Sequence, residues 1–204
     1  MILRLLDVEK DGSAIHQIRR RTLQELRFDP DHPSAKPLDY AVYLAAYSEG
    51  DDRPAGLAEA YFFDQAFPSY RESPFAAMDL EEFCPPTEMS YMRTIYVAPE
   101  HRGGPAYLQL SLAMGHLFHR MGARFAAITT LADSLTHARL YESTGGTRLG
   151  QVAFPNVPLA LALYVFDVGQ LVRHPRLRRA VDALEIGPEP LRTLTDRRLV
   201  SAAY

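Results

Sequence analysis

The chain has 204 residues, of which 47% are hydrophobic and 23% charged, which is ordinary for one soluble globular domain with a short appendage. Its net charge of −3 argues against broad electrostatic binding of nucleic acid, and no run of about 18 apolar residues predicts a membrane span. We therefore expect neither membrane nor nucleic acid as a partner. Cys84 is the single cysteine, so we expect no internal disulfide and a cytoplasmic setting.

The first elements predicted along the chain are a strand, a helix and a hairpin. Residues 2–8 have the pattern of a strand, and residues 13–28 have the spacing of a helix with Ser13 as its cap. Residues 40–48 and 55–63 predict two strands, and the polar EGDDRP between them favours an antiparallel hairpin. The predicted apolar face of the helix consists of Ile15, Ile18, Leu23 and Leu26.

The least regular stretch follows, at residues 64–87. Prolines punctuate it, and a short helix around residues 78–83 fits its pattern. A segment this long forms either a lid over a site or an insertion packed by its own aromatic residues, and the sequence leaves both alternatives open. The aromatic residues concerned are Phe67, Tyr70, Phe75 and Phe83.

The next three elements predict a strand, a helix and a second strand, at residues 89–97, 105–121 and 124–131. Apolar residues recur along the helix at steps of three and four, as expected for a buried face. A strand–helix–strand order implies that the two strands are parallel and joined by a crossover.

The last elements are a helix at 133–144, capped by Asp133 or Ser134, and strands at 147–154 and 158–166. The final strand is apolar at nearly every residue, so we expect it to be buried on both faces. Helices opened by Pro175 and Pro190 are predicted in the remaining tail.

A glycine-rich turn, VAPEHRGGP at residues 97–105, joins a strand to a helix. Glycines let the backbone approach a ligand, and Pro105 suits the first turn of a helix. The amides of Ala106 and Tyr107 would then face an anion such as a pyrophosphate, with Arg102 adding a charge-assisted contact. A plain strand-to-helix connection has the same pattern, so the turn by itself does not decide between the two.

Two motifs together resemble the GNAT (GCN5-related N-acetyltransferase) superfamily. The turn is similar to its cofactor motif, V-x-P-x-x-R-G-x-G-x-G/A, with Val97, Pro99, Arg102 and Gly103 in register. Residues 138–146, ARLYESTGG, are similar to its second motif, A-x-x-L-Y-E-K-x-G-F. The order of elements also resembles the family, from the first strand to about residue 166.

This resemblance implies an α/β fold with a GNAT-like mixed, mostly antiparallel sheet, flanking helices and a central splayed parallel strand pair. It implies an acyltransferase domain at 1–168, followed by a C-terminal helical extension at 169–204. It also implies that the strand before the turn takes up the pantetheine arm of CoA. The implied cofactor-binding residues are Ile95, Tyr96, Val97, Arg102, Gly103, Gly104, Ala106 and Tyr107.

Several positions depart from the family pattern. The spacing after Arg102 is one residue short, unless His101 takes the first basic position, and Pro105 removes one donor in either alignment. Gly146 replaces the common Phe, and Tyr91 stands where many relatives carry a Glu as general base.

The implied chemistry is direct attack of an amine on the thioester carbonyl, without a covalent enzyme intermediate. Tyr141 is the candidate acid for the leaving thiolate, although a helix tyrosine can instead belong to the core. Glu88 is the candidate base, with Glu59 and a water relay as alternatives. We expect no metal, because His116 and His119 stand three apart on one helix without a third ligand.

The leading interpretation is an N-acyltransferase that uses acetyl-CoA or another acyl-CoA as co-substrate and acylates an amine of a small molecule or peptide. A second is an N-acyl amino acid synthase similar to autoinducer synthases and supplied by acyl carrier protein; Arg93 lies one residue out of place for that group's strand signature. A third is a GNAT-like module that binds CoA without catalysis. A homodimer is compatible with all three.

Overall fold

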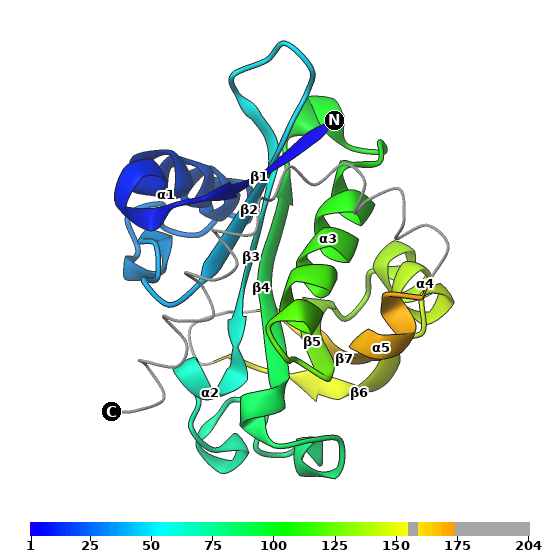
Figure 1. Ribbon diagram of the computed structural model, residues 1–204. Helices are drawn as coiled ribbons and strands as arrows, with labels where there is room; N and C mark the ends of the chain where they lie inside the picture. The colour runs from blue at the N-terminus through cyan, green and yellow to red at the C-terminus, as the bar shows by residue number, and fades with distance from the viewer. Residues whose placement is uncertain (155–158, 174–204) are drawn as a thin grey trace. The chain divides into compact units, whose positions relative to one another are not determined.

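The computed structural model describes residues 1–154 and 159–173. They form a seven-stranded mixed sheet with the strand order β1-β2-β3-β4-β5-β7-β6, together with flanking helices (Figure 1). The predicted α/β class and the mixed, mostly antiparallel sheet are confirmed. The tail helices predicted after Pro175 lie outside the described residues, and the domain boundary at 168 stays a prediction.

The described residues group into two compact units, which are treated separately below. The first consists of Met1–Ala60 and Thr94–Met114, and the second of Tyr61–Arg93 and 115–173. Among the described residues, none of the helices is both long enough and apolar enough to cross a lipid bilayer.

The first unit is built on an antiparallel hairpin. Strand β2 (Val42–Tyr47) pairs with β1 (Ile2–Leu6) on one side and with β3 (Pro54–Phe62) on the other. The antiparallel β2–β3 pair confirms the hairpin that the polar EGDDRP segment favours. Side chains alternate across a strand, so Gly56 and Glu59 of β3 point to opposite faces. Glu59 contacts helix α1 (Val8–Glu25), whereas Gly56 lies against helix α3 (Ala106–Arg120).

Helix α1 begins and ends earlier than its apolar pattern suggests. Asp7 caps it by accepting a hydrogen bond from the Glu9 amide at 2.8 Å, so Ser13 is an exposed residue inside the helix and the predicted cap is wrong. An acidic first turn favours the earlier start. Leu26 follows the last helical residue and is 47% exposed, so it does not belong to the predicted apolar face.

The second unit contains the parallel strand pair. Strand β4 (Met89–Val97) pairs with β5 (Phe125–Leu131) through Met89↔Phe125 to Met92↔Ile128, which confirms the predicted parallel arrangement. The segment before β4 holds one short helix and three single turns, and the predicted helix around 78–83 is only the 3₁₀ turn η3. These elements are α2 (Phe63–Ala66), η2 (Tyr70–Glu72), η3 (Leu80–Glu82) and η4 (Pro86–Glu88).

The end of the described chain completes the second unit. Helix α4 (Leu135–Ser143) is capped by Ser134, one of the two predicted caps. Strand β7 (Leu161–Asp167) pairs with β5 and with β6 (Thr147–Val152), and its five middle residues are all buried, as its continuous apolar run predicts. A final short helix, α5, spans Val168–Leu171.

Candidate functional site

The glycine turn lies between β4 and α3 in the first unit. A 3₁₀ turn, η5 (Pro99–His101), follows the strand, and residues 102–105 after it are exposed. Gly103 has a φ of +79°, a conformation that residues with a Cβ rarely adopt. The position therefore requires glycine for the path of the backbone, whether or not a ligand is present.

Helix α3 starts immediately after this turn, at Ala106. The amide of Gln109 donates to the carbonyl of Pro105 at 2.9 Å, which is the first step of the helical ladder. The first turn of α3, at the positive end of the helix dipole, therefore lies directly after the exposed glycines. This is the geometry that an oxyanion such as a pyrophosphate would use.

The end of β4 is held close to β3 and α3 by a glycine that sequence reasoning missed. A Cβ on Gly56 would lie 2.7 Å from the carbonyl oxygen of Tyr96 and 2.9 Å from Cδ1 of Leu110. Beside it, the Ala98 amide donates to the Ala55 carbonyl at 2.9 Å. A glycine inside an otherwise regular strand was the available signal, because it often marks a close approach of backbone.

Arg102 folds back toward the strand that precedes the turn. Its Nε donates to the Val97 carbonyl at 3.0 Å, and its Nη2 donates to Glu25, the last residue of α1. The Tyr96 hydroxyl donates to the same carboxylate at 3.3 Å. Burial, and then the charge of Glu25, raise the pKa of Tyr96. The structure thus brings two predicted cofactor residues, Tyr96 and Arg102, together on a carboxylate that the sequence did not single out.

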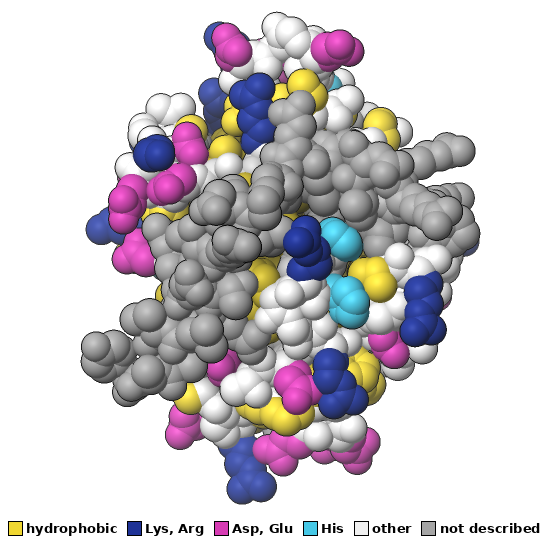
Figure 2. Space-filling model, viewed as in Figure 1, with side chains coloured by type: hydrophobic (Ala, Val, Ile, Leu, Met, Phe, Trp, Pro, Cys, Tyr) yellow, Lys and Arg dark blue, Asp and Glu magenta, His cyan; other side chains and the backbone are white. Residues whose placement is uncertain are grey.

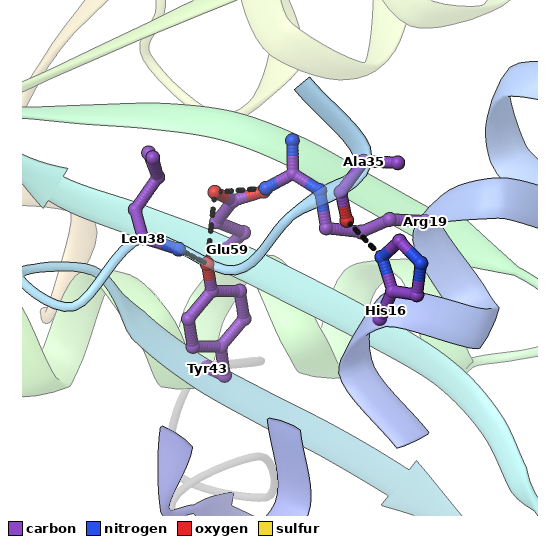
Figure 3. A network of polar contacts seen from close by, with 6 residues as sticks. All are labelled: His16, Arg19, Ala35, Leu38, Tyr43 and Glu59. Atoms are coloured by element: carbon purple, nitrogen blue, oxygen red, sulfur yellow. Dashed lines mark hydrogen bonds and ion pairs between the residues drawn. The ribbon is translucent and has the colours of Figure 1, made fainter. Parts of the chain in front are cut away.

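Glu59, an alternative base, lies in a separate buried network of the first unit. Figure 3 shows its carboxylate facing Arg19 of α1 and Tyr43 of β2. The Arg19 guanidinium donates to Glu59 at 2.5 Å, and the Tyr43 hydroxyl donates to it at 3.2 Å while accepting from the Leu38 amide. Burial, reinforced by the Glu59 charge, raises the pKa of Tyr43 to about 12. The Glu59 carboxylate is fully buried, and the network joins helix α1 to the hairpin. The role of Glu59 as an alternative base remains a prediction.

Tyr141, the candidate acid, lies on α4 in the second unit and is only 4% exposed. Its ring makes edge contacts with Tyr164 at 5.1 Å and Phe166 at 5.6 Å between centroids, and it stacks on His137 at 6.0 Å. Burial lowers the pKa of His137. These neighbours fix the direction of the phenol, which suits both a positioned acid and a core tyrosine.

Gly146, which replaces the family's Phe, has a structural explanation. A Cβ on Gly146 would lie 2.7 Å from the ring of Phe166, and that ring also contacts Tyr141. Phe166 of β7 therefore fills the space that a side chain at 146 would need.

Glu88, the candidate base, lies at the end of η4, and the structure gives it different neighbours from those of Tyr141. Its carboxylate accepts from Arg124 at 2.9 Å, and its side chain is 35% exposed. Tyr91, at the position of the family's Glu, is buried, with its hydroxyl 2.9 Å from Thr129 Oγ1. The roles of Glu88 and Tyr141 remain predictions.

The aromatic residues of segment 64–87 pack within their own unit. The Phe75 ring is fully buried and lies 5.4 Å from Tyr91 and 5.7 Å from Phe154. Tyr70 donates to the Cys84 carbonyl at 2.8 Å, and burial raises the pKa of the Cys84 thiol to about 11, as expected for an inert cysteine. Packing among aromatic rings is therefore the observed arrangement of this segment. The surface around α2 carries acidic and hydrophobic side chains (Figure 2).

Among the described residues, the histidine pair of α3, His116 and His119, belongs to no cluster of metal-ligating side chains. His116 is half-buried, and burial lowers its pKa, helped by the neighbouring charge of Arg120. No group of three or more metal-ligating side chains occurs within residues 1–154 and 159–173.

The chain is similar to solved structures of two kinds. One is a CoA-dependent acyl-homoserine lactone synthase, BjaI, at 16% identity and TM-score 0.63, covering 92% of this chain and 94% of that one. An N-acetyltransferase from Staphylococcus aureus Mu50 has 16% identity and TM-score 0.58, covering 82% and 98%. A protein from Desulfovibrio desulfuricans, assigned to the GNAT family as an acetyltransferase, has 16% identity and TM-score 0.55, covering 81% and 98%. The sequence matches no protein-family model and no curated protein sequence.

Proposed function

We propose that this chain, which has the GNAT-like fold, is an acyl-CoA-dependent N-acyltransferase that acylates an amine of a small molecule or peptide. The observation that carries the proposal is the strand–turn–helix geometry at residues 95–107. Exposed glycines there lead directly into the positive end of a helix of 15 residues.

Two parts of the CoA donor would be bound by two parts of the first unit. Backbone amides at the start of α3 would bind the pyrophosphate, and the end of β4 at Ile95–Val97 would take up the pantetheine arm. The similar structures support a CoA thioester, since one is described as a CoA-dependent synthase with isopentyl-CoA. They do not favour acyl carrier protein as the donor. Acetyl-CoA is the first donor to test. The aromatic residues of segment 64–87 pack against one another, so nothing in their arrangement favours a longer, apolar acyl chain.

The reaction needs one bond formed and one broken. The amine nitrogen attacks the thioester carbonyl carbon, the C–S bond breaks, and the thiolate leaves. Tyr141 would give its proton to the sulfur, while the amine proton would pass to Glu88 directly or through water. Holding donor and acceptor together would supply much of the acceleration.

Calorimetry with acetyl-CoA and with CoA tests the proposal. We expect wild-type protein to bind both, and Gly104→Val to weaken binding strongly, because the turn is exposed and a branched side chain would stand in the path of the phosphates. Gly150→Val is the control, since Gly150 lies in β6 of the second unit and a Cβ there would meet only Cε of Met78, at an ordinary contact distance of 3.6 Å. Folded wild-type protein that gives no heat with any acyl-CoA would refute the function.

A further inference from the structure

We propose that Glu25 sets the affinity of the cofactor turn by occupying Arg102 until an anionic ligand takes its place. The inference rests on the proposed function and adds an affinity-determining residue to the same site. It follows from a carboxylate that meets the motif arginine where the resemblance would put a phosphate.

The Arg102 guanidinium donates hydrogen bonds to two groups of the chain itself. One edge donates to the Val97 carbonyl at 3.0 Å, and another donates to Glu25, which lies 77 residues earlier in the chain. Tyr96 holds the other carboxylate oxygen of Glu25 at 3.3 Å. Glu25 is thus aimed at Arg102 from a fixed position.

The place of Glu25 in α1 supports a role beyond helix stability. It is the last residue of the helix, and the last turn contains no basic residue. A carboxylate is unfavourable at the negative end of a helix dipole. The charge of Arg102 offsets that cost. The pair therefore links the end of α1 to the turn that we propose binds the cofactor.

The pair is also accessible and easily exchanged. The side chains of Arg102 and Glu25 are 51% and 36% exposed. Exposed ion pairs are weak, shifting an equilibrium by about fivefold at most. The pyrophosphate of CoA carries two negative charges, against one on a carboxylate, and its oxygens can accept two parallel hydrogen bonds from a guanidinium. The ligand therefore displaces Glu25, but its apparent affinity is lowered by the pair that it must break.

Calorimetry with CoA at low salt, on the full chain, tests the exchange. Glu25→Gln keeps the shape of the side chain and removes its charge, and we expect CoA to bind about three- to fivefold more tightly. In an Arg102→Gln background the same change should bring no gain. Glu100→Gln is the matched control, because Glu100 is an exposed carboxylate of the same turn. It should change the affinity by less than about twofold.

Three outcomes would overturn the inference: unchanged or weaker binding by Glu25→Gln, an equal gain without Arg102, or an equal gain from Glu100→Gln. The last would mean that any acidic residue near the turn repels the ligand. Wild-type protein that binds no CoA refutes the proposed function instead, so the two failures are distinguishable.

Discussion

The turn between β4 and α3 presents backbone groups at the surface, whereas the segment from α2 to η4 withdraws aromatic side chains into its own unit. Gly103 and Gly104 are exposed, while Phe75 and Tyr70 are buried. Both segments are irregular and rich in glycine or proline. Irregular chain therefore exposes its backbone in one region, where we propose that CoA binds, and buries its side chains in the other.

Replacing Phe75 by Ser should have the largest effect and would test the packed region most directly. The ring is fully buried among other aromatic rings, so we expect the free energy of unfolding to fall by about 3–5 kcal/mol, measured by urea denaturation. Leu135→Ser is the control, since Leu135 is 70% exposed, and its change should stay within about 0.5 kcal/mol. A loss below about 1 kcal/mol at Phe75 would return the segment to the lid interpretation.

Tyr141 shares a feature with each of the two regions compared above: its ring is packed in the core, and its hydroxyl is the candidate acid. Tyr141→Phe keeps the ring, so we expect kcat to fall by about 100-fold, with the Kd for acetyl-CoA changed by less than about twofold. Steady-state kinetics with an acceptor found by screening amines, alongside calorimetry, separates the two quantities. An unchanged kcat would assign Tyr141 to the core alone.

Gly56→Ala should have a smaller effect and tests how far the exposed turn depends on a hidden contact. The added methyl would meet the Tyr96 carbonyl at 2.7 Å, and that backbone must move. We expect a loss of about 1–3 kcal/mol in the free energy of unfolding, together with weaker CoA binding.

Gly12→Ala is the matched variant, for which we expect the opposite change in the free energy of unfolding. Gly12 lies within α1 with nothing within 4 Å of the added carbon, so the change should stabilise by about 0.5–1 kcal/mol. If both glycine variants behave alike in thermal unfolding and calorimetry, the close approach at Gly56 does not govern the turn.

Local chemistry explains why much of this protein is predictable from sequence. The antiparallel hairpin, the parallel pair and the buried final strand follow from apolar periodicity and element order. The glycine turn follows from residues within one short segment, because glycine and proline act on their own backbone. The start of α1 was predicted wrongly because two caps compete, and Asp7 with an acidic first turn wins over Ser13.

Contacts between distant residues were decided only by the tertiary structure. Glu25 meets Arg102 across 77 positions, Gly56 of β3 makes room for the end of β4, and Phe166 fills the space beside Gly146. The burial of Phe75 likewise depends on rings from other elements. No local pattern encodes such pairs, because periodicity and capping describe each element by itself. The sequence by itself determined the order of elements and the turn that we propose binds CoA; packing decided which side chains surround that turn and which aromatic residues are withdrawn from solvent.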